Sequence, residues 1–142
     1  MNNKEYKIAK TLMFDNDLFS QWLGIDLIEI KPGYCALKMS IREEMTNGFK
    51  ISHGGITYSL ADSALAFASN SHGRMALSIE TSISHLVKVK VGDELIAIAN
   101  ETNRNDKIGL YEVEVRNQEN ILVAKFKGTV YFSNKEWEIK EM

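Results

Sequence analysis

The stretch HGGITYSLADSALAFASN, residues 53–70, carries the strongest secondary-structure signal in this chain. Its apolar side chains recur at helical spacing at Ile56, Leu60, Ala64 and Phe67. The stretch contains one carboxylate, Asp62, and no lysine, arginine or glutamate. A helix this poor in charge is usually covered on most of its sides. The sequence therefore predicts one long, buried helix from about Gly55 to Ser71, with Gly73 placed to end it.

The hydrophobic period changes from helical to two after this predicted helix. In LSIETSIS, residues 77–84, the side chains of Leu77, Ile79, Thr81 and Ile83 alternate with serines and a glutamate. The runs LVKVKV, ELIAIANET, GLYEVEVRN and ILVAKFKGTVYF continue in this style, with turn-forming residues between most of them. Such runs are typical of consecutive antiparallel strands joined by short connections.

The region before the long helix predicts two short helices and a hairpin. Residues 4–12 have helical character, and a second helix follows a cap at Asn16 or Asp17 and ends at Gly24. The runs IDLIEI and YCALKMSI flank the turn signal Lys-Pro-Gly, so residues 25–41 are predicted to form a hairpin.

The whole pattern indicates an α+β fold in which a long central helix is wrapped by a mostly antiparallel sheet. Residues 42–52 are polar and are expected to form a loop in which Gly48 is free to take unusual backbone angles. No repeat or low-complexity linker interrupts the chain. We therefore predict a single domain over residues 1–142, with an N-terminal helical segment over residues 1–24.

The charge balance argues against several classes of partner. The chain carries 17 basic and 19 acidic residues, well mixed, for a formal net charge of −2, so no charged field is present to grip nucleic acid or an anionic membrane. No run of about 18 apolar residues is available to span a membrane, and the opening MNNKEYKIAK lacks the apolar core of a signal peptide. Cys35 is the one cysteine, which favours a reducing compartment. We expect a soluble, cytoplasmic protein.

The usual sequence signals for cofactors and metals are absent. The chain has no phosphate-binding loop, no G-x-G-x-x-G and no G-x-S-x-G. His53, His72 and His85 have no partner at metal-ligand spacing, so we predict neither a metal nor a cofactor. His72 is interpreted as a polar helix end, and His85 as an alternating strand residue.

Asp62 admits two interpretations. A carboxylate on a helix usually faces solvent, but the neighbours of Asp62 are leucines and alanines, and burying a carboxylate costs several kcal/mol unless it is hydrogen-bonded or kept for function. The pair Gly54-Gly55 would supply the other part of a catalytic site. N–H groups at a helix N-terminus lack an intrahelical partner and can stabilise negative charge on a carbonyl oxygen. The two features together indicate acyl transfer or hydrolysis, with Asp62 as the nucleophile or as a base toward water.

The motif N-G-F-x-I-x-H-G-G starting at Asn47, an aspartate eight residues after Gly54, and A-x-A-x-x-S-N-S-x-G resemble the hotdog-fold thioesterases. The resemblance is greatest to the phenylacetic-acid-degradation (PaaI-like) branch and covers roughly residues 15–133. It implies hydrolysis of acyl-CoA thioesters at a subunit interface, within a homodimer or a homotetramer.

The resemblance also implies roles for individual residues. The Gly54 N–H would polarise the thioester carbonyl, and Asp62 of the neighbouring subunit would act as the nucleophile or general base. Asn47 would hold the attacking water or the substrate, and His53 would order the loop. Gly55 and Ser78 are predicted substrate-binding positions, with the alignment of Ser78 a loose one.

The sequence leaves the acyl group open. An aryl-acetyl group is one candidate, because several aromatic side chains are available to line a pocket, although core packing would equally explain them: Phe14, Phe19, Trp22, Phe49 and Tyr58. Several basic residues could bind the CoA phosphates, although exposed lysines and arginines are common on any protein surface: Lys50, Arg74, Lys88, Lys90, Arg104 and Lys107.

Two alternatives on the same fold are weighed against hydrolysis. A non-catalytic acyl-CoA-binding or regulatory protein is one, although no basic stripe or DNA-binding segment supports it. A dehydratase is the other. Its His-Phe-Pro-Gly form is excluded because the one proline, Pro32, lies in Lys-Pro-Gly, and its Asp-His form is disfavoured because Phe67 stands five residues after Asp62.

Overall fold

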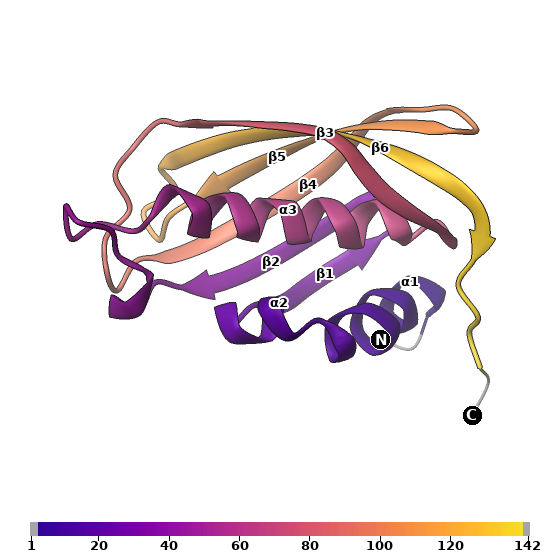
Figure 1. Cartoon of the computed structure of the whole chain (residues 1–142), viewed down its shortest axis with the longest axis horizontal. Helices are drawn as coiled ribbons and strands as arrows, with labels where there is room; N and C mark the ends of the chain where they lie inside the picture. Colours follow the sequence, from indigo (N-terminus) through magenta and orange to yellow (C-terminus); the bar gives the residue numbers. More distant parts are fainter. Residues whose placement is uncertain (1–2, 141–142) are drawn as a thin grey trace.

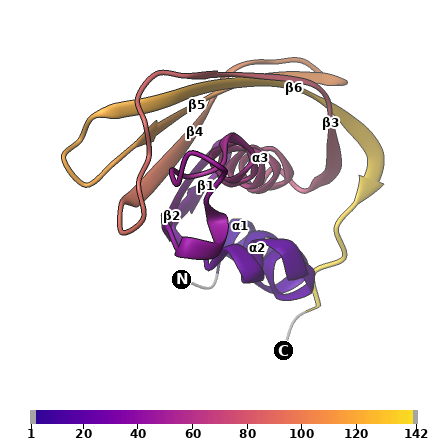
Figure 2. The same ribbon diagram turned by 60° about the vertical axis from the view of Figure 1, so that its left-hand side comes forward.

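One long helix, α3 (Gly54–Asn70), lies against a six-stranded antiparallel sheet that curves around it (Figures 1 and 2). The computed structural model describes residues 3–140. The strands follow the order β1-β2-β4-β5-β6-β3, each antiparallel to its neighbour. Their bounds are β1 (Asp26–Lys31), β2 (Tyr34–Ser40), β3 (Arg74–His85), β4 (Glu94–Arg104), β5 (Ile108–Arg116) and β6 (Leu122–Glu136). The predicted α+β arrangement is confirmed.

The N-terminal part of the chain is helical and packs along α3 on the side that the sheet leaves open (Figure 2). Its elements are α1 (Lys4–Tyr6), the π-helix η1 (Lys7–Met13), the 3₁₀ turn η2 (Phe14–Asn16) and α2 (Leu18–Leu23). Asp17 caps α2 by accepting the Ser20 N–H at 3.0 Å, and Gly24 ends it with a φ of 78°. Residues 1–2 of the predicted segment lie outside the described residues.

The core forms between α3 and the sheet. The buried side chains of the helix that face it are small or branched: Leu60, Ala61, Ala64, Leu65 and Ala68. Close approach also depends on Gly128 of β6, because a Cβ there would lie 2.6 Å from a methyl carbon of Leu65. Each fully buried leucine contributes about 1.5–3 kcal/mol to stability. This packing fixes the rotation of α3 and therefore the direction in which its polar residues point.

No helix in the described part of the chain is long and apolar enough to cross a membrane. The predicted hairpin over residues 25–41 is present as β1 and β2. The predicted long helix begins one residue earlier than expected, at Gly54, and Gly73 follows its end with a φ of 119°.

The prediction of a strand over LVKVKV is wrong. β3 ends at His85, and residues 86–91 form an irregular connection. Because His85 pairs with Ala124 and β6 begins at Leu122, the neighbouring strand runs out just where this segment starts. An alternating pattern without a partner strand does not make a ladder, since the backbone N–H and C=O groups must be paired elsewhere. One of these backbone groups, the Val89 carbonyl, is paired outside the sheet and accepts the Ser52 N–H at 2.8 Å.

The loop over residues 42–52 differs from expectation in two respects. It contains a 3₁₀ turn, η3 (Glu43–Met45), whose Met45 side chain is buried. The residue with an unusual backbone is not Gly48 but Lys50, which has a φ of 62°. The surrounding turn is held by the Asn47 side chain and does not depend on glycine.

Candidate active site

Asn47 organises the loop that leads into α3. Its Oδ1 accepts the Phe49 N–H at 2.9 Å and the Ile51 N–H at 3.4 Å, and its backbone N–H donates to the Ile51 carbonyl at 2.8 Å. An asparagine that closes a turn on its own backbone in this way is a common loop device. The Asn47 Nδ2 makes no hydrogen bond within the described residues 3–140, so the amide retains a donor for another partner.

His53 is the N-cap of α3. Its Nδ1 accepts the Gly55 N–H at 2.9 Å, and its carbonyl accepts the Ile56 N–H at 2.9 Å. Its own N–H donates to the Met45 carbonyl at 2.8 Å, which ties the start of the helix to the buried Met45 of η3. The ring therefore uses one nitrogen to satisfy a helix N–H group that would otherwise lack a partner.

Gly54 carries the N–H that this capping arrangement leaves free. Within residues 3–140 no acceptor pairs with it, whereas the N–H groups of Gly55 and Ile56 are both used by His53. It stands at the first position of a 17-residue helix, where the helix dipole gives the N–H partial positive charge. Gly54 does not have a positive φ, so its backbone conformation is open to other residues. What a side chain would meet is the ring of His85, whose Nε2 lies 3.1 Å from the position of a Cβ.

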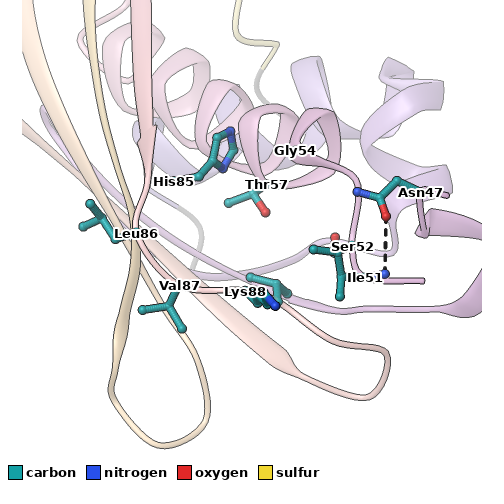
Figure 3. Close-up of a pocket in the computed structure, with 10 residues that line it drawn as sticks. Asn47, Ile51, Ser52, Gly54, Thr57, His85, Leu86, Val87 and Lys88 are labelled. Carbon is teal, nitrogen blue, oxygen red and sulfur yellow. Dashed lines mark hydrogen bonds between the residues drawn. The ribbon is translucent and has the colours of Figure 1, made fainter. Parts of the chain in front are cut away.

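A cavity of about 300 Å³ opens in front of this turn. Its lining comes from the Asn47 loop, the first turn of α3 and the connection after β3 (Figure 3): Asn47, Ile51, Ser52, Gly54, Thr57, His85, Leu86, Val87, Lys88 and Val89. Two of the predicted site residues, Asn47 and Gly54, are thus brought together in one cavity. The Ser52 hydroxyl in this lining is buried and has no hydrogen-bond partner within residues 3–140.

Asp62 lies on the same helix as Gly54 but does not line this cavity. Eight residues of α-helix separate them by about 12 Å along the axis. The Asp62 side chain is half-buried beside α2, where Ser20 bonds Ser63 at 2.8 Å, and no donor bonds its carboxylate within residues 3–140. Burial raises the pKa of the Asp62 carboxyl above its ordinary value, and the negative charge of Asp17 adds to the shift. The interpretation of Asp62 as a fully solvated residue therefore does not hold.

Ser78 lies apart from the other predicted positions. It is an exposed residue of β3, paired with Val130 of β6, and it does not line the cavity. β3 forms one of the two edges of the sheet, and its exposed surface includes Leu77 and Ile79, whose side chains are 78% and 60% exposed.

Sequence reasoning missed several residues of the cavity, above all His85, and also Ser52 and Thr57. The histidine was interpreted as an ordinary strand residue, because nothing local distinguishes it from its neighbours. Its contact with Gly54 joins the last residue of β3 to the first residue of α3. No group of three or more His, Cys, Asp or Glu side chains that could hold a metal ion occurs within residues 3–140.

Comparison with known proteins identifies the family. The model of a family described as the thioesterase superfamily matches residues 49–124. This chain is therefore an enzyme of the thioesterase superfamily, and its wrapped central helix is the hotdog fold. Within the superfamily it belongs to the PaaI-like branch, as its similarity in sequence and in structure to the first of the relatives below shows.

The first of these relatives is acyl-coenzyme A thioesterase PaaI of Escherichia coli, 36% identical over 128 residues, or 90% of this chain and 91% of the relative. The structure of the E. coli PaaI protein from the phenylacetic acid degradation operon superposes with a TM-score of 0.91 at 33% identity, covering 94% of this chain and 96% of that chain. A protein of Archaeoglobus fulgidus is 42% identical over 91% of this chain and 84% of its own length. A Streptococcus mutans protein superposes with a TM-score of 0.77 at 25% identity, covering 80% and 91% of the two chains.

Proposed function

We propose that this chain hydrolyses acyl-CoA thioesters to the free acid and CoA. The observation that carries the proposal is the unpaired Gly54 N–H at the start of α3, in a cavity that Asn47 also lines. Two relatives support a CoA thioester as the substrate. The E. coli PaaI relative is named an acyl-coenzyme A thioesterase, and the S. mutans protein was solved bound to acetyl CoA.

The Gly54 N–H suits the task of polarising a carbonyl. Attack on a thioester carbonyl moves negative charge onto its oxygen, and a fixed backbone donor at a helix N-terminus stabilises that charge. Since His53 already holds the Gly55 N–H, the two glycines divide their roles. Gly55 secures the cap, and Gly54 meets the substrate. The free Nδ2 of Asn47 adds a second donor on the same cavity, for the attacking water or for the thioester.

The reacting carboxylate comes from Asp62 of a second subunit. Within one chain, about 12 Å of helix separates Asp62 from the Gly54 N–H, which is too far for both to act on the same carbonyl. We infer that two chains associate so that Asp62 of each approaches the glycine turn of the other, at least as a homodimer. The exposed edge strand β3, with its apolar Leu77 and Ile79, supports such an association.

Two routes are open to Asp62. As a base, it takes a proton from water, whose oxygen attacks the carbonyl carbon; the C–S bond then breaks and CoA leaves as the thiolate. As a nucleophile, its carboxylate attacks the carbonyl carbon and expels the thiolate, and water then hydrolyses the mixed anhydride. In both routes the carboxyl must be ionised, and the Gly54 N–H faces the developing oxyanion.

An aryl-acetyl group fits the aromatic residues that the core does not use. Phe14 packs on Phe67, and Tyr58 packs on Phe126. Phe19 and Trp22 instead stack on each other at the surface of α2, the helix that lies beside Asp62. The relative from the phenylacetic acid degradation operon supports the same substrate class.

A screen of acyl-CoA thioesters tests the proposal. Straight-chain acyl-CoAs of increasing length and aryl-acetyl-CoAs are compared by release of free thiol, with the Asp62→Asn variant as the control for background hydrolysis. We expect hydrolysis by the wild-type chain, fastest with the aryl-acetyl forms. Binding of CoA thioesters without release of thiol above the rate in protein-free buffer would contradict the proposal and indicate a binding protein.

A further inference from the structure

His85 is the cavity residue whose role the reaction described above leaves open. It is the last residue of β3, and its ring projects toward the first turn of α3 (Figure 3). Its Nε2 is the side-chain atom nearest to the missing Cβ of Gly54, at 3.1 Å. The rings of His53 and His72 are each hydrogen-bonded, to the Gly55 N–H and to Glu101, whereas the His85 ring makes no hydrogen bond within residues 3–140.

The His85 Nε2 lies on the side of the turn toward which the Gly54 N–H points. In a helix the Cα–Cβ direction tilts toward the N-terminus, which is also where the unpaired N–H groups point. An atom in front of the Gly54 Cβ position therefore lies on the same side of the turn as an oxygen that accepts the Gly54 N–H at about 2.9 Å. A side chain at Gly54 would push the imidazole away from this place.

We propose that His85 is a further catalytic residue, whose Nε2–H donates a second hydrogen bond to the thioester carbonyl oxygen held by the Gly54 N–H. This inference rests on the proposed function. The proposal explains why position 54 has no side chain. The backbone angles there do not require glycine, but a Cβ would displace the His85 ring. Two donors on one oxygen, one from the backbone and one from a side chain, form a common oxyanion-stabilising arrangement.

The other residues of the cavity lining leave the His85 Nε2–H available to donate to the substrate. Lys88 is the one charged residue among the other residues of the cavity lining, and Asn47, Ser52 and Thr57 supply neutral polar groups. Within one chain the lining holds no carboxylate. The carboxylate that the proposed function brings to this turn, Asp62 of a second subunit, is directed at the carbonyl carbon or at water. The His53 ring, which precedes Gly54, is committed through Nδ1 to the helix cap.

Replacement by phenylalanine and by glutamine tests the assignment. His85→Phe keeps a ring against Gly54 but removes the donor, whereas His85→Gln places an amide N–H close to the position of Nε2. We expect His85→Phe to lower kcat by about 10²-fold with a small change in KM, and His85→Gln to recover most of that loss. Ser84→Ala, at an exposed neighbour whose side chain points to the other face of β3, is the matched control and should retain wild-type kcat.

A non-hydrolysable ketone analogue, in which a methylene replaces the thioester sulfur, gives a readout independent of turnover. Its Kd should rise by about three- to tenfold in His85→Phe and return toward the wild-type value in His85→Gln. A His85→Phe variant with wild-type kcat and Kd, or a His85→Gln variant no better than His85→Phe, would overturn the inference. If Asp62→Asn abolishes hydrolysis in the same preparations, the proposed function stands although this inference fails.

Discussion

Gly54 and Asp62 lie on the same helix, α3, about two turns and 12 Å apart along its axis, and their environments differ. Gly54 opens onto the cavity with an unpaired N–H, and Asp62 lies half-buried beside α2 with no donor on its carboxylate within residues 3–140. In the proposed reaction each residue supplies half of the hydrolytic site, and a two-fold pair of chains is the simplest arrangement that would join the halves.

Asp62→Asn should nearly abolish thioester hydrolysis without harming the fold. The amide keeps the shape of the side chain but cannot attack a carbonyl and is a very poor base. Because burial raises the pKa of Asp62, the folded state binds more protons than the unfolded state between the ordinary pKa and the raised one. Stability is therefore lost as the pH rises through that window, and ionised Asp62 is unfavourable at neutral pH. The variant should show an equal or higher Tm at pH 7 by calorimetry, and a large drop in Tm would contradict this account.

The pH dependence of kcat should carry the signature of the same carboxyl. Activity needs ionised Asp62, so kcat should rise with pH through the raised pKa of Asp62 and reach a plateau above it. The midpoint should lie above about 3.9, the ordinary value for an aspartate. Measurement of kcat from acid to neutral pH, with stability followed in parallel, gives this midpoint. A midpoint at or below the ordinary value would show that the group in control is not a desolvated Asp62.

Gly54→Ala should damage catalysis far more than stability. The backbone at Gly54 has no positive φ, and the atoms that a methyl group would crowd belong to the movable ring of His85. We expect kcat to fall toward the 10²–10³-fold loss typical of a removed oxyanion donor, with the Tm within a few degrees of wild type. Gly55→Ala is the informative comparison, because its methyl would meet the capping His53 ring at 3.1 Å and should lower the Tm instead. Unchanged kcat in Gly54→Ala would remove Gly54 from the site.

Much of this fold could be predicted from local patterns. The helix at residues 53–70 and the strands after Gly73 follow from hydrophobic period, and the caps at Asp17 and Gly24 follow from residue type. The segment LVKVKV shows the limit of such patterns, because its alternation is strand-like but β6 accepts only the N–H groups of its first two residues, both at Val123. A strand exists only where a partner is available, and local sequence does not contain that information.

The candidate site was predictable to the extent that its groups are adjacent in sequence. Asn47, His53 and Gly54 belong to one continuous motif, and the structure brings Asn47 and Gly54 to one cavity. His85 was not predictable in the same way, because its proximity to Gly54 arises from the path of β3 across the start of α3. The left-handed backbone conformation at Lys50 was likewise not predictable, since the Asn47 side chain and not a glycine supports that turn.

The apolar edge of β3 should be covered in solution. Replacing Ile79 with glutamate places a charge on a strand edge whose side chain is 60% exposed in the single chain. If this edge joins two chains, Ile79→Glu should shift the mass measured by light scattering from an oligomer to a monomer, and hydrolysis should be lost with it. Glu112→Gln, at an exposed position of the central strand β5, is the matched control and should remain oligomeric. A wild-type chain that is monomeric and active at assay concentration would contradict the shared site.

Mixing two inactive variants tests the shared site most directly. Asp62→Asn and Gly54→Ala chains are unfolded, mixed in equal amounts and refolded together. If Gly54 and Asp62 act across an interface, half of the pairs are hybrids with one intact site of two, and about one quarter of wild-type hydrolysis returns. As a control, the wild-type chain is mixed with the double variant carrying both changes; a shared site predicts about one quarter of wild-type activity there, and a site within one chain predicts about one half. A site shared between two chains predicts recovery to about one quarter of wild-type hydrolysis in the first mixture, and no recovery above the two variants alone would show that the site is not shared.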